Sequence, residues 1–359
     1  MDPQPGECHG GNRIAVARQL GCRPGQLLDA SASLVPFGPP ATLRLRLALA
    51  PGLRDYPDRQ HLALRQAIAR HHGLAPAMVL PGNGAAELFT WAARDAATAG
   101  TSVLPSPGFA DYGRALACWG GRWCAMPLPL QWPAVFPQPF PQPFPLEGEQ
   151  AVLWITNPHN PTGQLWSRAS LEPLLERFAL VIADEAFLPL LPQGEAQSLV
   201  PLLEHHGNLV VIRSLTKLFA IAGLRLGYAL GQPQRLERWA GWRDPWPLNG
   251  LASAAGTWLM ADGRWSQRVR HWLGREGPWL QQQLGCIAGL DPMPSAANFY
   301  LVRGQRSLEP LRQALESCHR ILVRDCRSFA GLNDHWLRLA VLDRRGNRRL
   351  LQALGRETA

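Results

Sequence analysis

A single lysine stands out in a chain whose positive charge is otherwise carried by arginine. The 359 residues contain 36 lysines and arginines together, and only Lys217 among them is a lysine. Arginine can replace lysine as a surface charge, but its guanidinium cannot lose a proton and form an imine with an aldehyde. The one retained primary amine therefore indicates that Lys217 takes part in covalent chemistry.

Polar residues elsewhere in the chain suit the binding of one particular cofactor. Asp184 follows an apolar run, Arg225 lies close behind Lys217, and a glycine-rich turn leads into a predicted helix. Pyridoxal phosphate needs an amine for its aldehyde, a carboxylate for its pyridine nitrogen and anion contacts for its phosphate. We predict this cofactor, with Lys217 and Asp184 as the catalytic residues. The predicted phosphate contacts are Gly82, Asn83, Gly84, Ala85 and Ala86 at the helix entry, together with Ser214 and Arg225.

Three short apolar runs are expected to position these groups, at residues 151–156, 179–183 and 209–212. Each is apolar throughout, which is typical of strands covered on both faces of a parallel sheet. The runs end in Asn157-Pro-His-Asn-Pro-Thr-Gly163, Asp184-Glu-Ala-Phe187 and Ser214-Leu-Thr-Lys217. Ligands of doubly wound sheets bind beyond the carboxyl ends of the strands, so these three segments should converge on one site.

The order of elements predicts an α/β fold with a mostly parallel sheet sandwiched by helices. Helices are expected over 62–72 and 85–97, and the pattern changes from about residue 241. There a long helix at 263–284 and short strands at 298–302, 320–323 and 336–341 indicate a smaller α+β domain. We expect an N-terminal arm (1–45) packed on the small domain, a large cofactor-binding domain (46–240) and a small C-terminal domain (241–359).

Taken in order, these segments resemble the fold-type I pyridoxal-phosphate enzymes, in particular the class I/II aminotransferase superfamily. The resemblance covers nearly the whole chain. The segments that carry it are Tyr56-Pro-Asp58, Gly82-Asn-Gly84, Pro105-Ser-Pro-Gly-Phe109, Asn157-Pro-His-Asn-Pro-Thr-Gly163, Asp184-Glu-Ala-Phe187, Ser214-Leu-Thr-Lys217 with Arg225, and Arg338. Each motif alone is of weak to moderate specificity, and their order and spacing together are specific.

The resemblance implies roles for four further residues. Phe109 resembles the aromatic residue that stacks on the pyridine ring, and Asn160 the asparagine that binds its 3′-oxygen. Tyr56 is similar to the tyrosine that reaches the phosphate of a neighbouring subunit, which implies a homodimer with shared active sites. Arg338 resembles the arginine that grips the substrate α-carboxylate by a bidentate pair. Phe187 departs from the family pattern, because many aminotransferases have tyrosine there.

Three segments resemble, more closely, the threonine-phosphate decarboxylases of cobalamin biosynthesis. They are His9-Gly-Gly-Asn12, Asp29-Ala-Ser-Ala-Ser33 with Pro36-Phe-Gly-Pro-Pro40, and Ile321-Leu-Val-Arg-Asp-Cys326. Members of that family convert O-phospho-L-threonine to an aminopropanol phosphate. The resemblance implies that His9, Asn12 and Arg324 bind substrate beside Arg338. Ser33 and Val35 depart from it, since asparagines are frequent at both positions.

The formal net charge of +9 favours anionic partners, either nucleic acid or a small phosphorylated molecule. The charge is dispersed, and the densest basic run is Arg344, Arg345, Arg348 and Arg349. Such a run is typical of a solvated helix face rather than of a nucleic-acid surface. We therefore expect a small phosphorylated amino-acid substrate and no nucleic-acid partner.

The seven cysteines are scattered and form no CxxC pair, which predicts no metal site and suits a reducing cytoplasm. The first residues have neither a basic nor an apolar stretch of the kind found in secretion signals. Residues 123–146 carry no charge, but their eight prolines exclude a membrane-spanning helix. This stretch, with the repeat at 136–145, is interpreted as an extended surface connection. No membrane association is expected.

Two alternatives to the decarboxylase remain open from the sequence. A histidinol-phosphate aminotransferase shares the fold and also binds a phosphorylated amine, and carbon dioxide release against amino transfer to 2-oxoglutarate separates the two. A non-catalytic sensor or nucleic-acid binder on the same fold is suggested by the basic charge, because fold does not fix function. A salt-dependent affinity for DNA without cofactor absorbance would favour that alternative.

Overall fold

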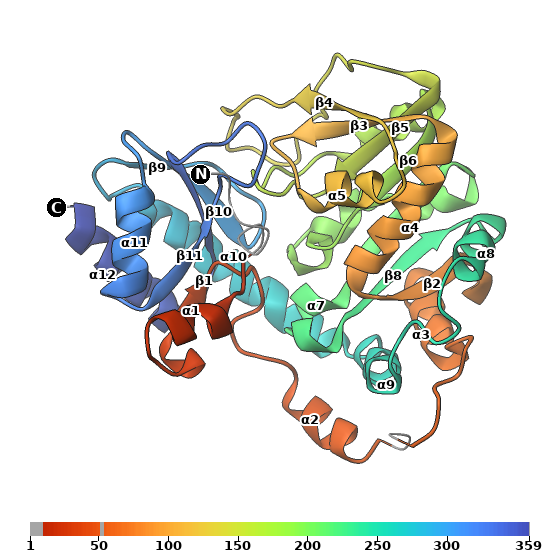
Figure 1. The fold of residues 1–359 in the computed structure, drawn as a ribbon, viewed down its shortest axis with the longest axis horizontal. Helices are drawn as coiled ribbons and strands as arrows, with labels where there is room; N and C mark the ends of the chain where they lie inside the picture. Colours follow the sequence, from red (N-terminus) through yellow and green to blue (C-terminus); the bar gives the residue numbers. More distant parts are fainter. Residues whose placement is uncertain (1–9, 51–53, 359) are drawn as a thin grey trace.

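A computed structural model describes residues 10–50 and 54–358 of the chain as two sheets with their helices (Figure 1). His9 lies outside the described residues. The larger sheet has the order β2-β8-β7-β6-β5-β3-β4. Its strands are β2 (Val79–Asn83), β3 (Thr101–Ser106), β4 (Trp123–Pro127), β5 (Gly148–Thr156), β6 (Phe178–Asp184), β7 (Leu209–Ser214) and β8 (Leu226–Gly231). Strand β8 runs antiparallel to both neighbours and the other pairs are parallel, which confirms the predicted fold class.

The strands of the larger sheet are apolar on both faces because each face is covered. On one face, Trp154, Ile182 and Ile212 pack with Leu88 and other residues of helix α4 (Gly84–Ala99), which crosses the sheet in Figure 1. The alternate residues of the same strands belong to the larger core on the opposite face. The other helices of this part are α3 (Leu62–His72), α5 (Asp111–Ala117), α6 (Arg168–Leu171), α7 (Leu215–Leu218), α8 (Pro233–Gly241) and α9 (Gly250–Leu259).

The smaller sheet has the order β1-β11-β12-β10-β9. Its strands are β1 (Leu28–Ala30), β9 (Leu290–Pro292), β10 (Phe299–Gly304), β11 (Ile321–Asp325) and β12 (Trp336–Ala340), and its helices are α10 (Gly263–Leu284), α11 (Glu309–Ser317) and α12 (Arg344–Thr358). Arg345, Arg348 and Arg349 are exposed on α12, as a solvated helix face requires.

The N-terminal part of the chain joins the smaller sheet. Helix α1 (Arg13–Gln19) precedes β1, which pairs in parallel with β11 (Leu28 opposite Ile321). Helix α2 (Ala41–Ala48) then leads back toward the larger sheet and contacts α9 (Figure 1). Helix α9 also packs against α3 and contacts β8. Residues 250–259, which follow position 241, therefore pack with the larger sheet. The domain boundaries at 45 and 240 stay a prediction.

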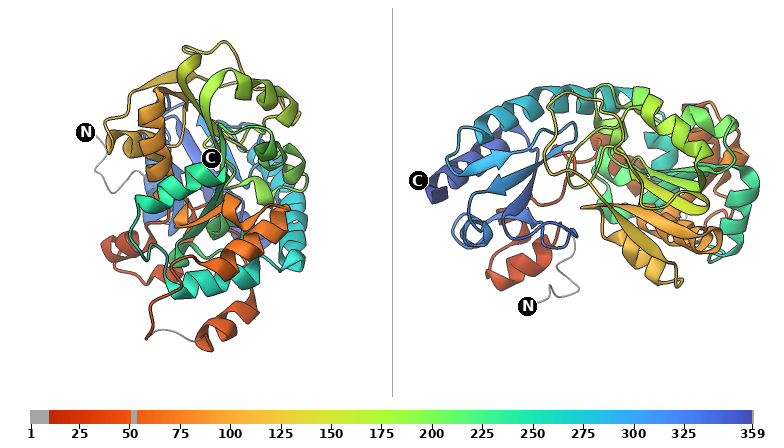
Figure 2. Two further views of the ribbon diagram at one scale, coloured as in Figure 1. Left: turned by 90° about the vertical axis from the view of Figure 1, so that its right-hand side faces the viewer. Right: turned by 90° about the horizontal axis from the view of Figure 1, so that it is seen from above.

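The proline-rich connection between β4 and β5 has no helix, and its only ladder contact among the described residues is a bridge between Gln138 and Trp166. Its yellow trace lies between the two parts of the molecule in the right-hand view of Figure 2. Phe140 is buried, whereas Pro137 and Pro139 are exposed. The connection is therefore irregular, with part of it at the surface, as predicted, and with an aromatic side turned inward. Over the described residues, none of the helices combines the length and apolar content needed to cross a membrane.

Candidate active site

A cavity of about 330 Å³ lies at the carboxyl ends of β6 and β7, between the two sheets. The location is the one expected for a parallel sheet with helices on both faces. Of the residues predicted from the sequence, Ala85, Ala86, Phe109, Asn160, Asp184, Ser214, Lys217, Arg225, Arg324 and Arg338 line it. The three loops that follow β5, β6 and β7 therefore converge, as the spacing predicts.

Asp184 is the last residue of β6 and is buried against α5. Its Oδ2 accepts a hydrogen bond from the Tyr112 hydroxyl (2.6 Å) and its Oδ1 accepts one from the Ala186 backbone N–H (2.9 Å). The Tyr112 hydroxyl also contacts Thr156 Oγ1 at 2.8 Å, on the neighbouring strand. Burial raises the pKa of Asp184 to about 6, although both hydrogen bonds oppose the rise. A cation in the cavity, such as a protonated pyridine nitrogen, would favour the ionised carboxylate.

Lys217 lies on α7, directly after β7, and lines the same cavity. Burial, and then the positive charges of Arg338 and Arg225, lower the pKa of Lys217 to about 8, and only Asp184 acts in the opposite direction. The Lys217 ammonium lies 5.8 Å from the centre of the Phe187 ring. A larger fraction of this amine is therefore unprotonated near neutral pH than of an ordinary lysine, which favours attack on a carbonyl.

This pKa can be measured in the cofactor-free protein because Lys217 carries the only side-chain amine. We expect competitive labelling with an amine-reactive reagent, followed by peptide mass spectrometry, to give a midpoint near pH 8. Arg338→Met removes a neighbouring positive charge, so the midpoint should move to higher pH. The α-amino group is resolved as a separate peptide and serves as the internal control. A midpoint in the range of free lysine in the wild-type protein would contradict the effect of burial.

The entry of α4 forms a cup of anion-binding groups. Gly84 has a φ of +75°, and a Cβ on it would lie only 2.5 Å from Nη2 of Arg225, so the guanidinium packs directly on the first turn of the helix. Ser214 Oγ and Thr216 Oγ1 are 2.7 Å apart at the same end of the cavity. Free backbone N–H groups at a helix N-terminus and a guanidinium together favour a phosphate group.

Arg338 and Arg324 occupy the side of the cavity formed by the smaller sheet. They are direct neighbours on the antiparallel strands β12 and β11, and both side chains are buried. Arg338 donates from Nη1 to Asn160 Oδ1 and from Nη2 to the Ser31 carbonyl oxygen (3.3 Å). Burial, and then the charge of Arg324, lower the pKa of Arg338 to about 10. Two adjacent buried guanidinium groups favour an anionic ligand, which would offset their repulsion.

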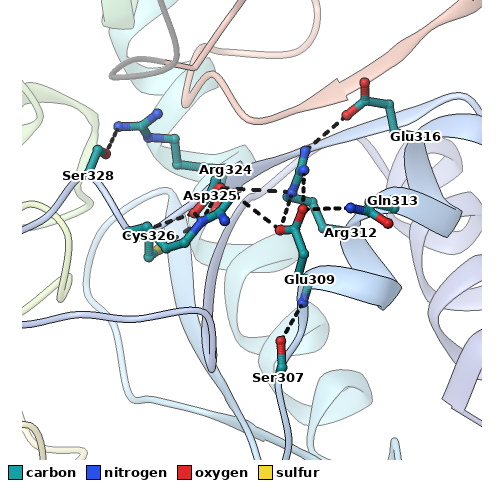
Figure 3. Close-up of polar contacts among 10 residues, drawn as sticks. Ser307, Glu309, Arg312, Gln313, Glu316, Arg324, Asp325, Cys326 and Ser328 are labelled. Atoms are coloured by element: carbon teal, nitrogen blue, oxygen red, sulfur yellow. Dashed lines mark hydrogen bonds and ion pairs between the residues drawn. The ribbon is translucent and has the colours of Figure 1, made fainter. Parts of the chain in front are cut away.

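The last two residues of β11, Arg324 and Asp325, turn to opposite sides of the strand. Arg324 donates to Ser328 Oγ at 2.5 Å, whereas Asp325 turns the other way into an ion-pair cluster with Arg312 and Arg327 (Figure 3). Asp325 is thus engaged with these two outer arginines on the far side of the strand. Arg324 is left facing the cavity, as the family resemblance implies for a substrate-binding arginine.

Some predicted residues do not reach this cavity. Tyr56 is 78% exposed and stacks on Trp246, with 4.3 Å between the ring centres. Asn12 is exposed just before α1, and Asn83 is exposed before α4, where its backbone N–H donates to Glu87 (2.6 Å). Gly82 lies on β2 and leaves room for Leu88 rather than lining the cavity. The roles of Tyr56, Asn12 and His9 therefore stay predictions.

Two important residues of the site were not predicted. Tyr112 binds Asp184, and it lies three residues after Phe109, on the following helix, so its proximity to the ring-stacking position was a usable signal. Phe329 lines the cavity beside both arginines, at 5.1 Å from the guanidinium carbon of Arg324 and 5.8 Å from that of Arg338. No sequence pattern marks Phe329.

The residues present fit pyridoxal phosphate. A partly deprotonated amine on Lys217 and a buried carboxylate on Asp184 lie in one cavity, with an anion cup at one end of it. The glycine at position 84 keeps the cup open, because any side chain there would displace Arg225. The residues that would hold the cofactor are Lys217, Asp184, Asn160, Phe109, Ser214 and Arg225 with the first turn of α4.

Comparison with known proteins agrees with this site. A model of the family "Aminotransferase class I and II" matches residues 25–354. Threonine-phosphate decarboxylase of Salmonella typhimurium is 35% identical over 356 residues, 96% of this chain and 95% of that protein. Histidinol-phosphate aminotransferase of Symbiobacterium thermophilum is 33% identical over 349 residues, 94% and 92% of the two chains.

A solved structure with the same fold contains the cofactor. Histidinol-phosphate aminotransferase of Sinorhizobium meliloti, in complex with pyridoxal-5′-phosphate, superposes with a TM-score of 0.83 at 24% identity and covers 96% of this chain and 94% of that one. The match of the family model over nearly the whole chain and the convergence of Lys217, Asp184 and the anion cup lead to the same conclusion. The chain is a pyridoxal-phosphate-dependent enzyme that belongs to the class I and II aminotransferase family.

Proposed function

We propose that the chain decarboxylates O-phospho-L-threonine to (R)-1-aminopropan-2-yl phosphate in cobalamin biosynthesis. The observation that carries the proposal is the pair of buried arginines, Arg324 and Arg338, that face the cavity from adjacent strands. They are additional to Arg225, which belongs to the cofactor cup. A phosphorylated amino acid brings a phosphate and a carboxylate, and two guanidinium groups match these two anions.

The reaction breaks the bond between Cα and the carboxylate carbon, carbon dioxide leaves, and a proton is added to Cα. Bound pyridoxal phosphate would supply the electron sink for the pair left on Cα. Arg338 would hold the carboxylate and so orient the bond that breaks, and Asp184 would keep a proton on the pyridine nitrogen. Lys217, with a pKa of about 8, is able to carry the proton that Cα receives.

The 35% identical relative supports this reaction, and the 33% identical relative favours a second candidate, amino transfer from histidinol phosphate. Histidinol phosphate carries a phosphate but no carboxylate, so it would use the cavity's paired arginines less completely. Phe187 also lines the cavity and supports decarboxylation over amino transfer. The family resemblance implies a tyrosine at this position in many aminotransferases, and phenylalanine offers the cofactor ring no such hydroxyl. We therefore infer the decarboxylase as the main activity.

We further infer a cytoplasmic homodimer in which Tyr56 reaches the partner's cofactor phosphate. Tyr56 is 78% exposed and its ring does not line the cavity of its own chain, which supports a role in a second copy. The exposed Leu45 lies on α2 and the exposed Leu49 directly follows it, in the same part of the chain, and burial of both side chains in a dimer would be favourable.

The proposal is tested by incubating the cofactor-loaded enzyme with O-phospho-L-threonine. We expect carbon dioxide and aminopropanol phosphate in equal amounts, with no requirement for 2-oxoglutarate. Histidinol phosphate with 2-oxoglutarate serves as the competing substrate pair, and glutamate is its readout. Release of glutamate there, without carbon dioxide from O-phospho-L-threonine, would replace the decarboxylase by the aminotransferase.

A further inference from the structure

The connection between β4 and β5, residues 128–147 and called here the proline strap, is fixed to the larger part of the molecule at its middle. Gln138 is buried, and its backbone N–H donates to the Leu165 carbonyl oxygen at 2.8 Å. Its side-chain oxygen accepts a hydrogen bond from Gln164 (3.2 Å), and Phe140 packs in the core beside it. The strap therefore rests on the loop that carries Asn160.

The first half of the strap reaches the smaller sheet. The Trp132 indole N–H donates to the Pro294 carbonyl oxygen at 2.8 Å, although the two residues are 162 positions apart. Leu130 and Trp132 also pack on a buried cluster of the smaller part of the molecule, called here the Phe329 cluster. Its members are Met293, Leu301, Cys326, Phe329, Leu332 and Trp336.

A second link joins the start of the strap to the same region. The Leu128 backbone N–H donates to the Ser106 carbonyl oxygen (2.7 Å), and the Ser106 hydroxyl donates to the Ala330 carbonyl oxygen (3.0 Å). Ala330 is the residue after Phe329. The strap and the end of β3 therefore hold the loop around Phe329 from two directions.

Phe329 connects this packing to the substrate side of the cavity. Its ring lies within cation–π distance of Arg324 and Arg338, both of which are buried. A guanidinium is attracted to the face of an aromatic ring, so a shift of the ring changes the preferred position of each arginine. Binding of two anions by two arginines is sensitive to small displacements of the pair.

We propose that the proline strap positions the anion-binding arginines through Phe329, and that Trp132, in the first half of the strap, is the positioning residue. Prolines fix the backbone φ angle, so this segment can span the two parts of the molecule without being flexible. The inference rests on the proposed function only in taking Arg324 and Arg338 as the groups that bind the substrate's anions.

The test compares Trp132→Ala and Trp132→Phe with the wild-type enzyme. For Trp132→Ala we expect the KM for O-phospho-L-threonine to rise by about tenfold and kcat to change by less than about threefold. The affinity for pyridoxal phosphate should stay unchanged, because the cofactor cup is formed by the first turn of α4, Ser214 and Arg225, and none of these belongs to the strap or to the Phe329 cluster. Hydrogen exchange of residues 324–332 should become faster. Trp132→Phe keeps the ring and loses the hydrogen bond, so the same changes should be smaller.

Trp119→Ala is the matched control. The Trp119 indole also donates to a backbone carbonyl at 2.8 Å, that of Thr90, but both residues belong to the larger part of the molecule. An equal rise of KM in Trp119→Ala, or unchanged KM and exchange in both Trp132 variants, would overturn the proposal. The exchange measurement needs no substrate, so it decides on the strap even if the wild-type enzyme does not act on O-phospho-L-threonine.

Discussion

Lys217→Arg will hold no pyridoxyl group after borohydride reduction and desalting, whereas the wild-type chain will hold one. The substitution keeps the positive charge beside Asp184 but removes the only side-chain amine of the chain. A guanidinium cannot form an imine with the cofactor's aldehyde, and because it stays protonated at neutral pH it cannot transfer a proton to or from the substrate. Activity should fall on the order of 10³-fold or more, because attachment and proton transfer are lost together. Intact-protein mass spectrometry measures the label.

The control for Lys217→Arg tests whether an amine at another position can bind the cofactor's aldehyde. Arg264 is exposed at the start of α10, away from the cavity, so Arg264→Lys in the Lys217→Arg background restores an amine without restoring its position. We expect this double variant to remain unlabelled and inactive, with an unfolding midpoint close to that of Lys217→Arg. A pyridoxyl group retained by Lys217→Arg together with wild-type activity would show that the covalent attachment is elsewhere.

The strands that carry this chemistry could be predicted because their surroundings are simple. Residues 151–155, 179–183 and 209–212 are apolar at every position because one set of side chains faces α4 and the alternate set faces the main core. The same alternation places Asp184 and Ser214 on the α4 side, where the cavity lies. The sequence therefore indicates both the strands and the end at which their polar residues meet.

The contacts that tune the site could not be predicted, because they depend on packing between distant segments. The hydrogen bond from Tyr112 to Asp184 joins residues 72 positions apart and requires α5 to lie over the ends of β5 and β6. Phe329 reaches the cavity only because the loop after β11 folds back beneath the two arginines. The spacing of residues along the sequence does not predict contacts between such distant segments.

The proline repeat, too, could be predicted from the sequence only in part. Its composition predicts an extended connection at the surface, and the structure shows an irregular connection without a helix, whose prolines Pro137 and Pro139 are exposed. Phe140 and Phe144 nevertheless turn inward and stack with 5.9 Å between ring centres, and Trp132 bonds to the smaller part of the molecule. Composition indicates stiffness and exposure of the backbone, whereas the surface on which the aromatic side chains rest is a property of the folded chain.

The second prediction concerns Arg324 and Arg338, which should bind different parts of the substrate. Arg338 is bound to Asn160, the predicted partner of the cofactor ring, so it lies on the side where the α-carboxylate would be held. Arg324 lies on the neighbouring strand β11, opposite Arg338, and its side chain donates a hydrogen bond to Ser328. Each charge-assisted contact contributes about 1.5–3 kcal/mol, which corresponds to roughly tenfold to a hundredfold in efficiency.

Arg338→Ala should therefore lower kcat/KM for both O-phospho-L-threonine and free threonine, since both carry the carboxylate. Arg324→Ala should lower kcat/KM for O-phospho-L-threonine alone. The ratio of kcat/KM between O-phospho-L-threonine and free threonine should therefore fall by roughly tenfold or more. Arg303→Ala is the control, because this arginine is on the same sheet but exposed, beside Trp336. If Arg324→Ala kept the full preference for the phosphorylated substrate, the phosphate would be bound by another group. Equal wild-type activity on the two amino acids would exclude a phosphate site altogether.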